Sequence, residues 1–256
     1  MGKLKHIIIL TILLFTCPAS GLDYSLDLSG VSSREHMQDW DPNWISEYEE
    51  DFDYYEWQVD PGNGGQVGVW TGSGNPTASP GINRDYSQFI AAGPPAGTKI
   101  RVRMKFEHRD DGSWVSCCHY GDTPMDRGHY EVALQSGSLR IYKFWQDWSA
   151  SVSQTSYSAT QGTTYWIYLT ETRVGNATDG NVTIDGELLD ESLNSLATVS
   201  VTDTGSLGGE ALINSTNKRG FGSYSAADGN GPKIFEWHVE DASPVPANAI
   251  KGVTIN

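Results

Sequence analysis

The segment Gly128–Trp145 constrains the fold of this 256-residue chain more than any other stretch. Apolar and polar residues alternate in it over two runs, and a period of two is typical of strands with one buried face. Ser136-Gly137 separates the runs and predicts a hairpin turn. We therefore predict a central antiparallel hairpin, with His129 and Glu131 pointing outward. Its apolar positions are Tyr130, Val132, Leu134, Leu139, Ile141, Tyr142 and Phe144.

A second strong alternation, over Lys99–His108, predicts a long strand with a basic outer face. The basic residues at positions 101, 103 and 105 alternate there with apolar ones. We expect them to pair with acids on neighbouring strands, and an anion-binding face is the alternative. Asp110-Asp111-Gly112 predicts a hairpin turn back into the strand Trp114–Tyr120.

The rest of the chain predicts short strands and turns, with one short helix over Leu188–Leu196. Asp185-Gly186 is interpreted as a turn. A chain of this length fits one large all-β domain. The remaining predicted strands are 22–28, 85–91, 163–172, 181–184, 199–202, 211–214, 220–224, 233–239 and an edge strand over 250–256.

The N-terminus has the order of a secretory signal. Lys3 and Lys5 precede the apolar run Ile7–Phe15, and small residues follow as far as Gly21. We predict a signal peptide over 1–21, an extension over 22–49, a β-sandwich over 50–241 and a tail over 242–256. The mature protein is then extracellular or periplasmic, without membrane insertion.

Charge excludes some partners. The formal charge of −15 becomes −17 after the signal is removed, with 15 basic against 32 acidic residues. A strongly acidic protein repels phosphate backbones and anionic lipids, so nucleic acid is not an expected partner.

Two adjacent cysteines, Cys117 and Cys118, remain in the mature chain. Neighbouring cysteines can form only a strained eight-membered ring, so no disulfide closes a long loop. Two reduced buried thiols are one interpretation. A vicinal disulfide, favoured by an oxidising compartment, is the other.

The segment Glu35–Asp60 holds ten acids, no Lys or Arg, and interleaved aromatics. A solvated acidic face over an aromatic edge accounts for this pattern. A structural Ca²⁺ site is the alternative, because hard cations need several carboxylate and carbonyl oxygens, but no EF-hand spacing is present. We predict no other cofactor.

A resemblance to a known superfamily rests on the order of several segments: Asp51–Trp57, Lys99–His108, Gly128–Tyr142, Tyr165–Leu169, Asn181–Gly186, Phe221–Tyr224 and Ile234–Asp241. In this order the chain resembles the concanavalin A-like and laminin G-like jelly rolls. The resemblance implies an antiparallel β-sandwich. Relatives of this kind include carbohydrate-binding modules, adhesion domains and polysaccharide lyases, so the fold alone does not choose a function.

Aromatic residues favour a secreted carbohydrate-binding or adhesion protein over an enzyme. The 9 Trp and 12 Tyr exceed what one core can hide, and apolar sugar faces stack on exposed rings. The Trp145–Trp148 segment follows a strand, where we expect a loop. The residues predicted to contact a glycan are Trp145, Trp148, Trp114, Tyr120 and Trp70.

Two alternatives stay open. A polysaccharide lyase needs a base, a proton donor and a group that neutralises the sugar carboxylate. The residues available for it are His119, Tyr120, His129 and Arg127. An extracellular matrix or filament subunit, associating through its terminal strands, is the other alternative.

Three sequons, at Asn176, Asn181 and Asn214, would accept glycans in a suitable host. The sequence shows no nucleophile elbow, so we predict no Ser-His-Asp triad.

Overall fold

The computed structural model shows an antiparallel β protein. It describes residues 24–33, 35–36, 40, 44–46, 57–60, 68–71, 81–85, 99–109, 114–120, 128–135, 137–145, 148–174, 180–207, 218–224 and 232–242. In these ranges the chain forms two sheets. No helix within them is long and apolar enough to cross a membrane.

One sheet has nine strands. Their order is β14-β13-β12-β7-β16-β5-β4-β2, and β1 also pairs with β16. The strands are β1 (Tyr24–Ser25), β2 (Glu35–His36), β4 (Trp57–Asp60), β5 (Gly68–Thr71), β7 (Lys99–Glu107), β12 (Thr164–Val174), β13 (Asn181–Asp190), β14 (Ser195–Asp203) and β16 (Lys233–Asp241).

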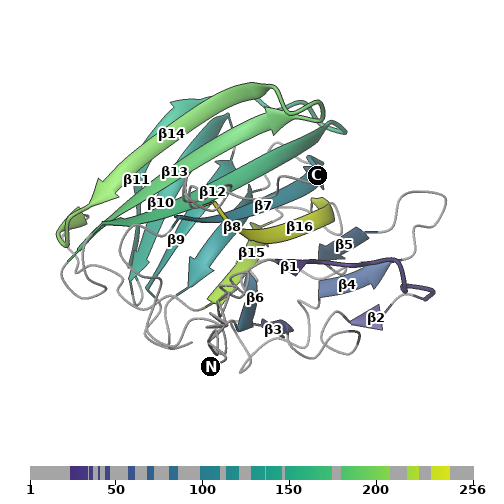
Figure 1. Ribbon diagram of the computed structural model, residues 1–256. Helices are drawn as coiled ribbons and strands as arrows, with labels where there is room; N and C mark the ends of the chain where they lie inside the picture. The colour runs from purple at the N-terminus through teal and green to yellow at the C-terminus, as the bar shows by residue number, and fades with distance from the viewer. Residues whose placement is uncertain are drawn as a thin grey trace, which may run out of the picture.

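The other sheet has seven strands in the order β11-β10-β9-β8-β15-β6-β3. They are β3 (Trp44–Ser46), β6 (Gly81–Asp85), β8 (Trp114–Tyr120), β9 (His129–Gln135), β10 (Ser138–Trp145), β11 (Trp148–Ser156) and β15 (Lys218–Tyr224). Figure 1 shows the long strands β12–β14 stacked over β9–β11. The predicted fold class, an antiparallel jelly-roll β-sandwich, is confirmed.

The central hairpin is confirmed. β9 and β10 pair continuously from Gln135–Ser138 to His129–Phe144. Gly137 lies in the connecting turn with a φ of 82°. This left-handed conformation costs glycine less than any residue with a Cβ, which accounts for the tight reversal.

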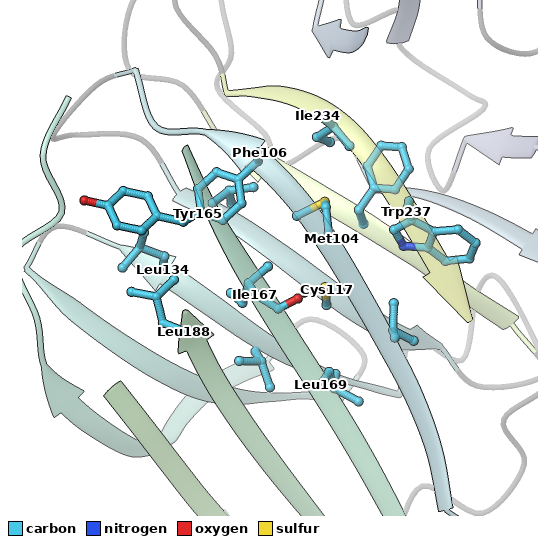
Figure 2. Packing of buried hydrophobic residues seen from close by; sticks show 14 of the residues in the cluster. Met104, Phe106, Cys117, Leu134, Tyr165, Ile167, Leu169, Leu188, Ile234 and Trp237 are labelled. Carbon is cyan, nitrogen blue, oxygen red and sulfur yellow. Dashed lines mark hydrogen bonds between the residues drawn. The ribbon is translucent and has the colours of Figure 1, made fainter. Parts of the chain in front are cut away.

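The core fills the space between the two sheets. On β7 the residues Ile100, Val102, Met104 and Phe106 are buried and their neighbours are only partly so, as the alternation predicts. Figure 2 shows Met104 and Phe106 packed with Cys117 and Leu134 from the opposite sheet.

The predicted basic ladder is also confirmed, because its cations pair with acids on β16 and in the turn after β13. Arg101 Nη1 lies 3.3 Å from Glu240 Oε1, and Arg103 Nε lies 3.7 Å from Glu240 Oε2. Lys105 Nζ lies 3.0 Å from Glu191 Oε1 and 3.9 Å from Glu236 Oε1. The cations are therefore balanced within the sheet, in agreement with the first of the two interpretations.

The hairpin predicted at Asp110-Asp111-Gly112 is wrong. β7 pairs with β12 and β16, whereas β8 pairs with β9 and β15. The chain therefore passes from one sheet to the other between Glu107 and Trp114. The turn chemistry of Asp-Gly fits such a crossing as well as a hairpin, because it specifies a local reversal but not which strands pair.

Two further predictions are wrong in β13 and in its connection to β14. Asp185-Gly186 lies in the middle of β13, and the segment predicted as a helix, Leu188–Leu196, forms the end of β13, a turn and the start of β14. Gly186 is required in the strand because Val132 of the opposite sheet approaches its backbone closely.

Other predicted segments differ in extent from the observed strands or lie outside the described residues. The strand predicted over Asp85–Ala91 shares only Asp85 with the observed β6, Gly81–Asp85, and residues 86–98 lie outside the described part of the chain. The signal peptide, the strand over 211–214 and the edge strand over 250–256 also lie outside it. The segment 22–49 contributes β1, β2 and β3.

Candidate functional site

The outer surface of the seven-stranded sheet carries polar and aromatic side chains on its central hairpin. They alternate with core residues such as Val132 and Ile141, so they lie on the opposite face of the sheet. We call this cluster the β9–β10 face and define it by His129, Glu131, Gln135, Arg140, Tyr142 and Phe144.

At one end of the β9–β10 face an imidazole lies between a ring and a carboxylate. The rings of His129 and Phe144, cross-strand partners, are stacked with centroids 4.2 Å apart. His129 Nε2 lies 3.2 Å from Glu131 Oε1. His129 and Glu131 lie on the outer face of the sheet, as predicted, but they are only 6% and 4% exposed. The stacked Phe144 ring covers the imidazole, which accounts for part of this burial.

At the other end a chain of hydrogen bonds fixes the polar groups. Arg140 Nε donates to Ser138 Oγ at 2.6 Å, and Arg140 Nη1 donates to Tyr142 Oη at 3.1 Å. The Tyr142 hydroxyl in turn donates to Gln135 Oε1. A side chain held at several points loses little further freedom when it binds a ligand, so this arrangement is preorganised.

Three members of the face, Gln135, Arg140 and Phe144, are partly exposed. They present an amide, a guanidinium and an aromatic ring. On the neighbouring strand β11, Ser151 and Gln154 are exposed and pair with Tyr142 and Arg140. An accessible ring beside fixed donors and acceptors suits a ligand that has both an apolar face and hydroxyl groups.

The structure places four of the five predicted aromatic contacts in this sheet. Trp145 is the last residue of β10, Trp148 is the first residue of β11, and the two are cross-strand partners. They therefore belong to strands and not to the loop that the sequence predicts. Tyr120 pairs with His129, and Trp114 pairs with Gln135. For these four residues the structure describes only the strand and its register.

These aromatics do not gather at one point. Tyr120 and Trp145 lie near the same end of the sheet, whereas Trp114 is six residues away along β8, which corresponds to about 20 Å of strand. Trp70 belongs to β5 of the other sheet, where it pairs with Gln58. A single compact site therefore does not include all five.

The residues proposed for a lyase are only partly brought together. Tyr120 is the cross-strand partner of His129, but His119 pairs with Tyr130, one position further along. Arg127 lies outside the described residues. Because successive strand residues alternate between faces, the register aligns Tyr120 but not His119 with His129.

Sequence reasoning missed most of the β9–β10 face. Gln135, Arg140 and Tyr142 were not among the predicted site residues, which were mainly tryptophans and histidines. The signal was present in the polar positions of the hairpin itself, which share one face once the register of the Gly137 turn is known.

Cys117 is a free thiol in the core, and its Sγ donates to the carbonyl oxygen of Ile167 at 3.5 Å. Burial, and to a lesser extent the charge of Glu131, raises the pKa of this thiol well above its usual value. Cys117 and Cys118 pair regularly with Val132 and Glu131, an extended geometry unlike that of a vicinal ring. The interpretation as a reduced buried thiol is confirmed for Cys117.

No three His, Cys, Asp or Glu side chains gather to hold a metal ion in the part of the chain that the structure describes. Most of the acidic segment Glu35–Asp60 lies outside that part. The Ca²⁺ site there stays a prediction.

No protein-family model matches the chain, and no curated protein matches it in sequence. Solved structures do match. A protein of unknown function with a galectin-like fold from Bacillus subtilis is 9% identical, covers 87% of this chain and 97% of its own, and has a TM-score of 0.52. This match agrees with the β-sandwich fold.

Two other structures are similar at lower TM-scores. The CBM2 module of the evolved Dit of Lactobacillus casei BL23 phage J-1 is 11% identical, with 87% of this chain and 96% of that chain covered and a TM-score of 0.46. The carbohydrate-binding module CBM66 from Bacillus subtilis is 9% identical, with 75% and 91% covered and a TM-score of 0.41.

Proposed function

We propose that this protein is a secreted glycan-binding β-sandwich and that the β9–β10 face contacts the glycan. One observation carries the proposal: the partly exposed Phe144 ring lies on the same sheet face as the fixed hydrogen-bonding chain of Arg140, Tyr142 and Gln135. The predicted signal peptide supports export, and the acidic charge favours neutral sugars over sulfated ones.

The parts of the face have distinct roles in the proposal. The Phe144 ring stacks on the apolar face of a sugar, and the rigid His129 ring beneath holds it in place. Arg140 and Gln135 donate hydrogen bonds to sugar hydroxyls through the N–H groups that they do not use in the hydrogen bonds with Ser138 and Tyr142. Tyr120 and Trp114, which pair with His129 and Gln135, extend the contact along β8.

The test is calorimetric titration against a panel of neutral and uronate-containing polysaccharides. Phe144→Ala and Arg140→Ala should each weaken binding by about tenfold or more, since tenfold corresponds to about 1.4 kcal/mol. Trp114→Ala and Tyr120→Ala measure how far the contact extends in each direction along β8. Ser200→Ala, an exposed change on the other sheet, is the matched control and should bind as the wild type does.

Two results would overturn the proposal. If the folded wild type binds no member of the panel, the protein is not a glycan-binding module for these polymers. If Phe144→Ala and Arg140→Ala both bind normally, the glycan contacts another surface. Release of unsaturated sugar products, lost in His129→Ala, would instead support the lyase alternative.

A further inference from the structure

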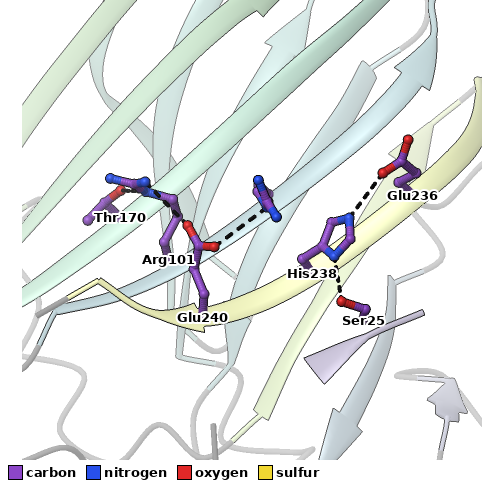
Figure 3. A network of polar contacts seen from close by, with 7 residues as sticks. Ser25, Arg101, Thr170, Glu236, His238 and Glu240 are labelled. Carbon is purple, nitrogen blue, oxygen red and sulfur yellow. Dashed lines mark hydrogen bonds and ion pairs between the residues drawn. The ribbon is translucent and has the colours of Figure 1, made fainter. Parts of the chain in front are cut away.

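On the outer face of the nine-stranded sheet, a serine near the N-terminus meets a histidine and a glutamate that lie two residues apart on β16. Ser25 of β1 and His238 of β16 are cross-strand partners, and Ser25 Oγ lies 2.7 Å from His238 Nδ1. The other ring nitrogen, His238 Nε2, lies 3.2 Å from Glu236 Oε2. Figure 3 shows the three side chains in this order.

In the neutral form of His238, its partners fix the direction of both hydrogen bonds. An ionised carboxylate can only accept, so the bond to Glu236 requires the proton on Nε2. Nδ1 then carries a lone pair and accepts the hydroxyl proton of Ser25. A serine that donates to a neutral imidazole, which in turn donates to a carboxylate, is the arrangement of an activated nucleophile.

The surroundings hold the imidazole while leaving the hydroxyl accessible. The His238 ring stacks on Trp166 with centroids 6.1 Å apart, and the histidine side chain is 17% exposed. Ser25, by contrast, is exposed. The base is thus oriented and largely shielded, and the nucleophile faces solvent.

Two cations of β7 lie on the side of the trio away from Ser25. Arg103 is the cross-strand partner of His238 on the side away from Ser25, and its guanidinium carbon lies 5.7 Å from the centre of the Trp166 ring. Lys105 Nζ lies 3.9 Å from Glu236 Oε1. Arg103 thus packs on the ring against which His238 is stacked, and Lys105 pairs with the carboxylate that orients His238.

We propose that Ser25, His238 and Glu236 form a hydrolytic site that cleaves carboxylic esters with small acyl groups. The trio lies on an open sheet face, which suits a short acyl chain carried by a larger molecule. This activity is separate from glycan binding on the other sheet, and Ser25→Ala should leave that binding unchanged.

The reaction balances with water as the second reactant. Ser25 Oγ attacks the carbonyl carbon while its proton passes to His238 Nδ1, and a bond forms between Oγ and the acyl carbon. The ester C–O bond then breaks, and the leaving alkoxide takes the proton from His238. Water attacks the acylated serine as His238 removes its proton, and the carboxylic acid leaves as Ser25 regains its hydrogen.

The first experiment measures p-nitrophenyl acetate hydrolysis and labelling by a fluorophosphonate, with the labelled peptide found by mass spectrometry. The label should reside on Ser25, and Ser25→Ala and His238→Gln should each lower hydrolysis by at least about 100-fold. Ser200→Ala is the matched control, because Ser200 Oγ donates at 2.6 Å to Asp185 Oδ1 on the same sheet face but contacts no imidazole.

A second variant separates catalysis from folding. In Ser25→Cys the thiol should be alkylated by iodoacetamide, and adding His238→Gln should slow this alkylation about tenfold, because the imidazole no longer generates thiolate. If the wild type is not labelled at Ser25, or if the alkylation rate does not depend on His238, the trio only anchors β1 to β16 and the proposal is overturned.

Discussion

Lys143 Nζ lies 2.7 Å from Asp203 Oδ2, and neither side chain has any solvent exposure. Tyr130 Oη donates to the same carboxylate oxygen at 2.6 Å, and Lys143 Nζ also donates to the carbonyl of Leu207 at 3.2 Å. Lys143 and Tyr130 belong to the seven-stranded sheet and Asp203 to β14 of the other. A buried ion pair thus joins the two layers beside the hairpin that carries the β9–β10 face.

Removal of one member of this pair should destabilise the protein strongly. Asp203→Ala leaves the Lys143 charge in the core without its carboxylate, and we expect the free energy of unfolding to fall by about 3–5 kcal/mol. The double variant Lys143→Met/Asp203→Leu should lose less than either single charge deletion, because no charge stays buried. Urea denaturation of this double variant and of Lys143→Met and Asp203→Leu alone measures the three losses, and additive losses would contradict this account.

The same carboxylate should make stability depend on pH. Burial alone raises the pKa of Asp203, but hydrogen bonds from Lys143, Tyr130 and Gly205 together hold that pKa below its usual value. The folded-state pKa is therefore lower than the unfolded one of about 4. The stabilisation is complete above that pH and is lost as the pH falls through the folded-state pKa.

Unfolding curves of wild type and Asp203→Asn at several pH values test this dependence. The difference in the free energy of unfolding between them should be largest above about pH 4 and should shrink at lower pH. A difference that stays constant down to pH 2 would show that the carboxylate does not titrate as described.

The strands that the sequence identified correctly are those in which a single residue period dominates. Over Lys99–Glu107 each apolar residue is buried and each charged residue is not, so the pattern alone determines the face. Only the first part of β13, the predicted strand 181–184, was recognised, because Gly186 interrupts the alternation and its role depends on Val132, 54 positions away in the chain.

The burial of several charged residues could not be predicted from the sequence either. Glu171 lies between Arg173 and Arg219 in the core, with Arg219 Nη2 3.3 Å from Glu171 Oε2. Charged residues on a strand predict a face exposed to solvent. The charge of Glu171 is instead paired in the core, and one partner, Arg219, comes from the opposite sheet. The Ser25–His238 contact could not be predicted either, because the two residues are 213 positions apart and only the pairing of β1 with β16 brings them together.

Cys117 should be chemically inert in the folded protein. Its thiol is fully buried and its raised pKa leaves little thiolate, the form that reacts. Iodoacetamide at pH 8 should leave Cys117 unlabelled in native protein and label it in urea, as peptide mass mapping would show. Loss of two hydrogens at Cys117-Cys118, reversed by reductant, would instead favour the vicinal disulfide.

Gly186 allows β13 to approach the hairpin strand β9. A Cβ at this position would lie 2.6 Å from Val132 Cγ1 and 2.8 Å from Val199 Cγ1. Valine side chains have few rotamers with which to move aside, so Gly186→Ala should cost about 1–3 kcal/mol of unfolding free energy. Gly30→Ala is the control, because a Cβ there meets nothing within 4 Å, and it should change stability by less than about 0.5 kcal/mol.

A double-mutant cycle connects this cost to the packing of the two sheets. Val132→Ala alone removes buried methyl groups and should destabilise the core. In Gly186→Ala/Val132→Ala the new methyl group occupies part of the space that valine leaves, so the combined loss should be smaller than the sum of the single losses by about 1 kcal/mol. If the two losses simply add, the cost at Gly186 arises from its own strand, and the close approach of β9 does not explain the glycine.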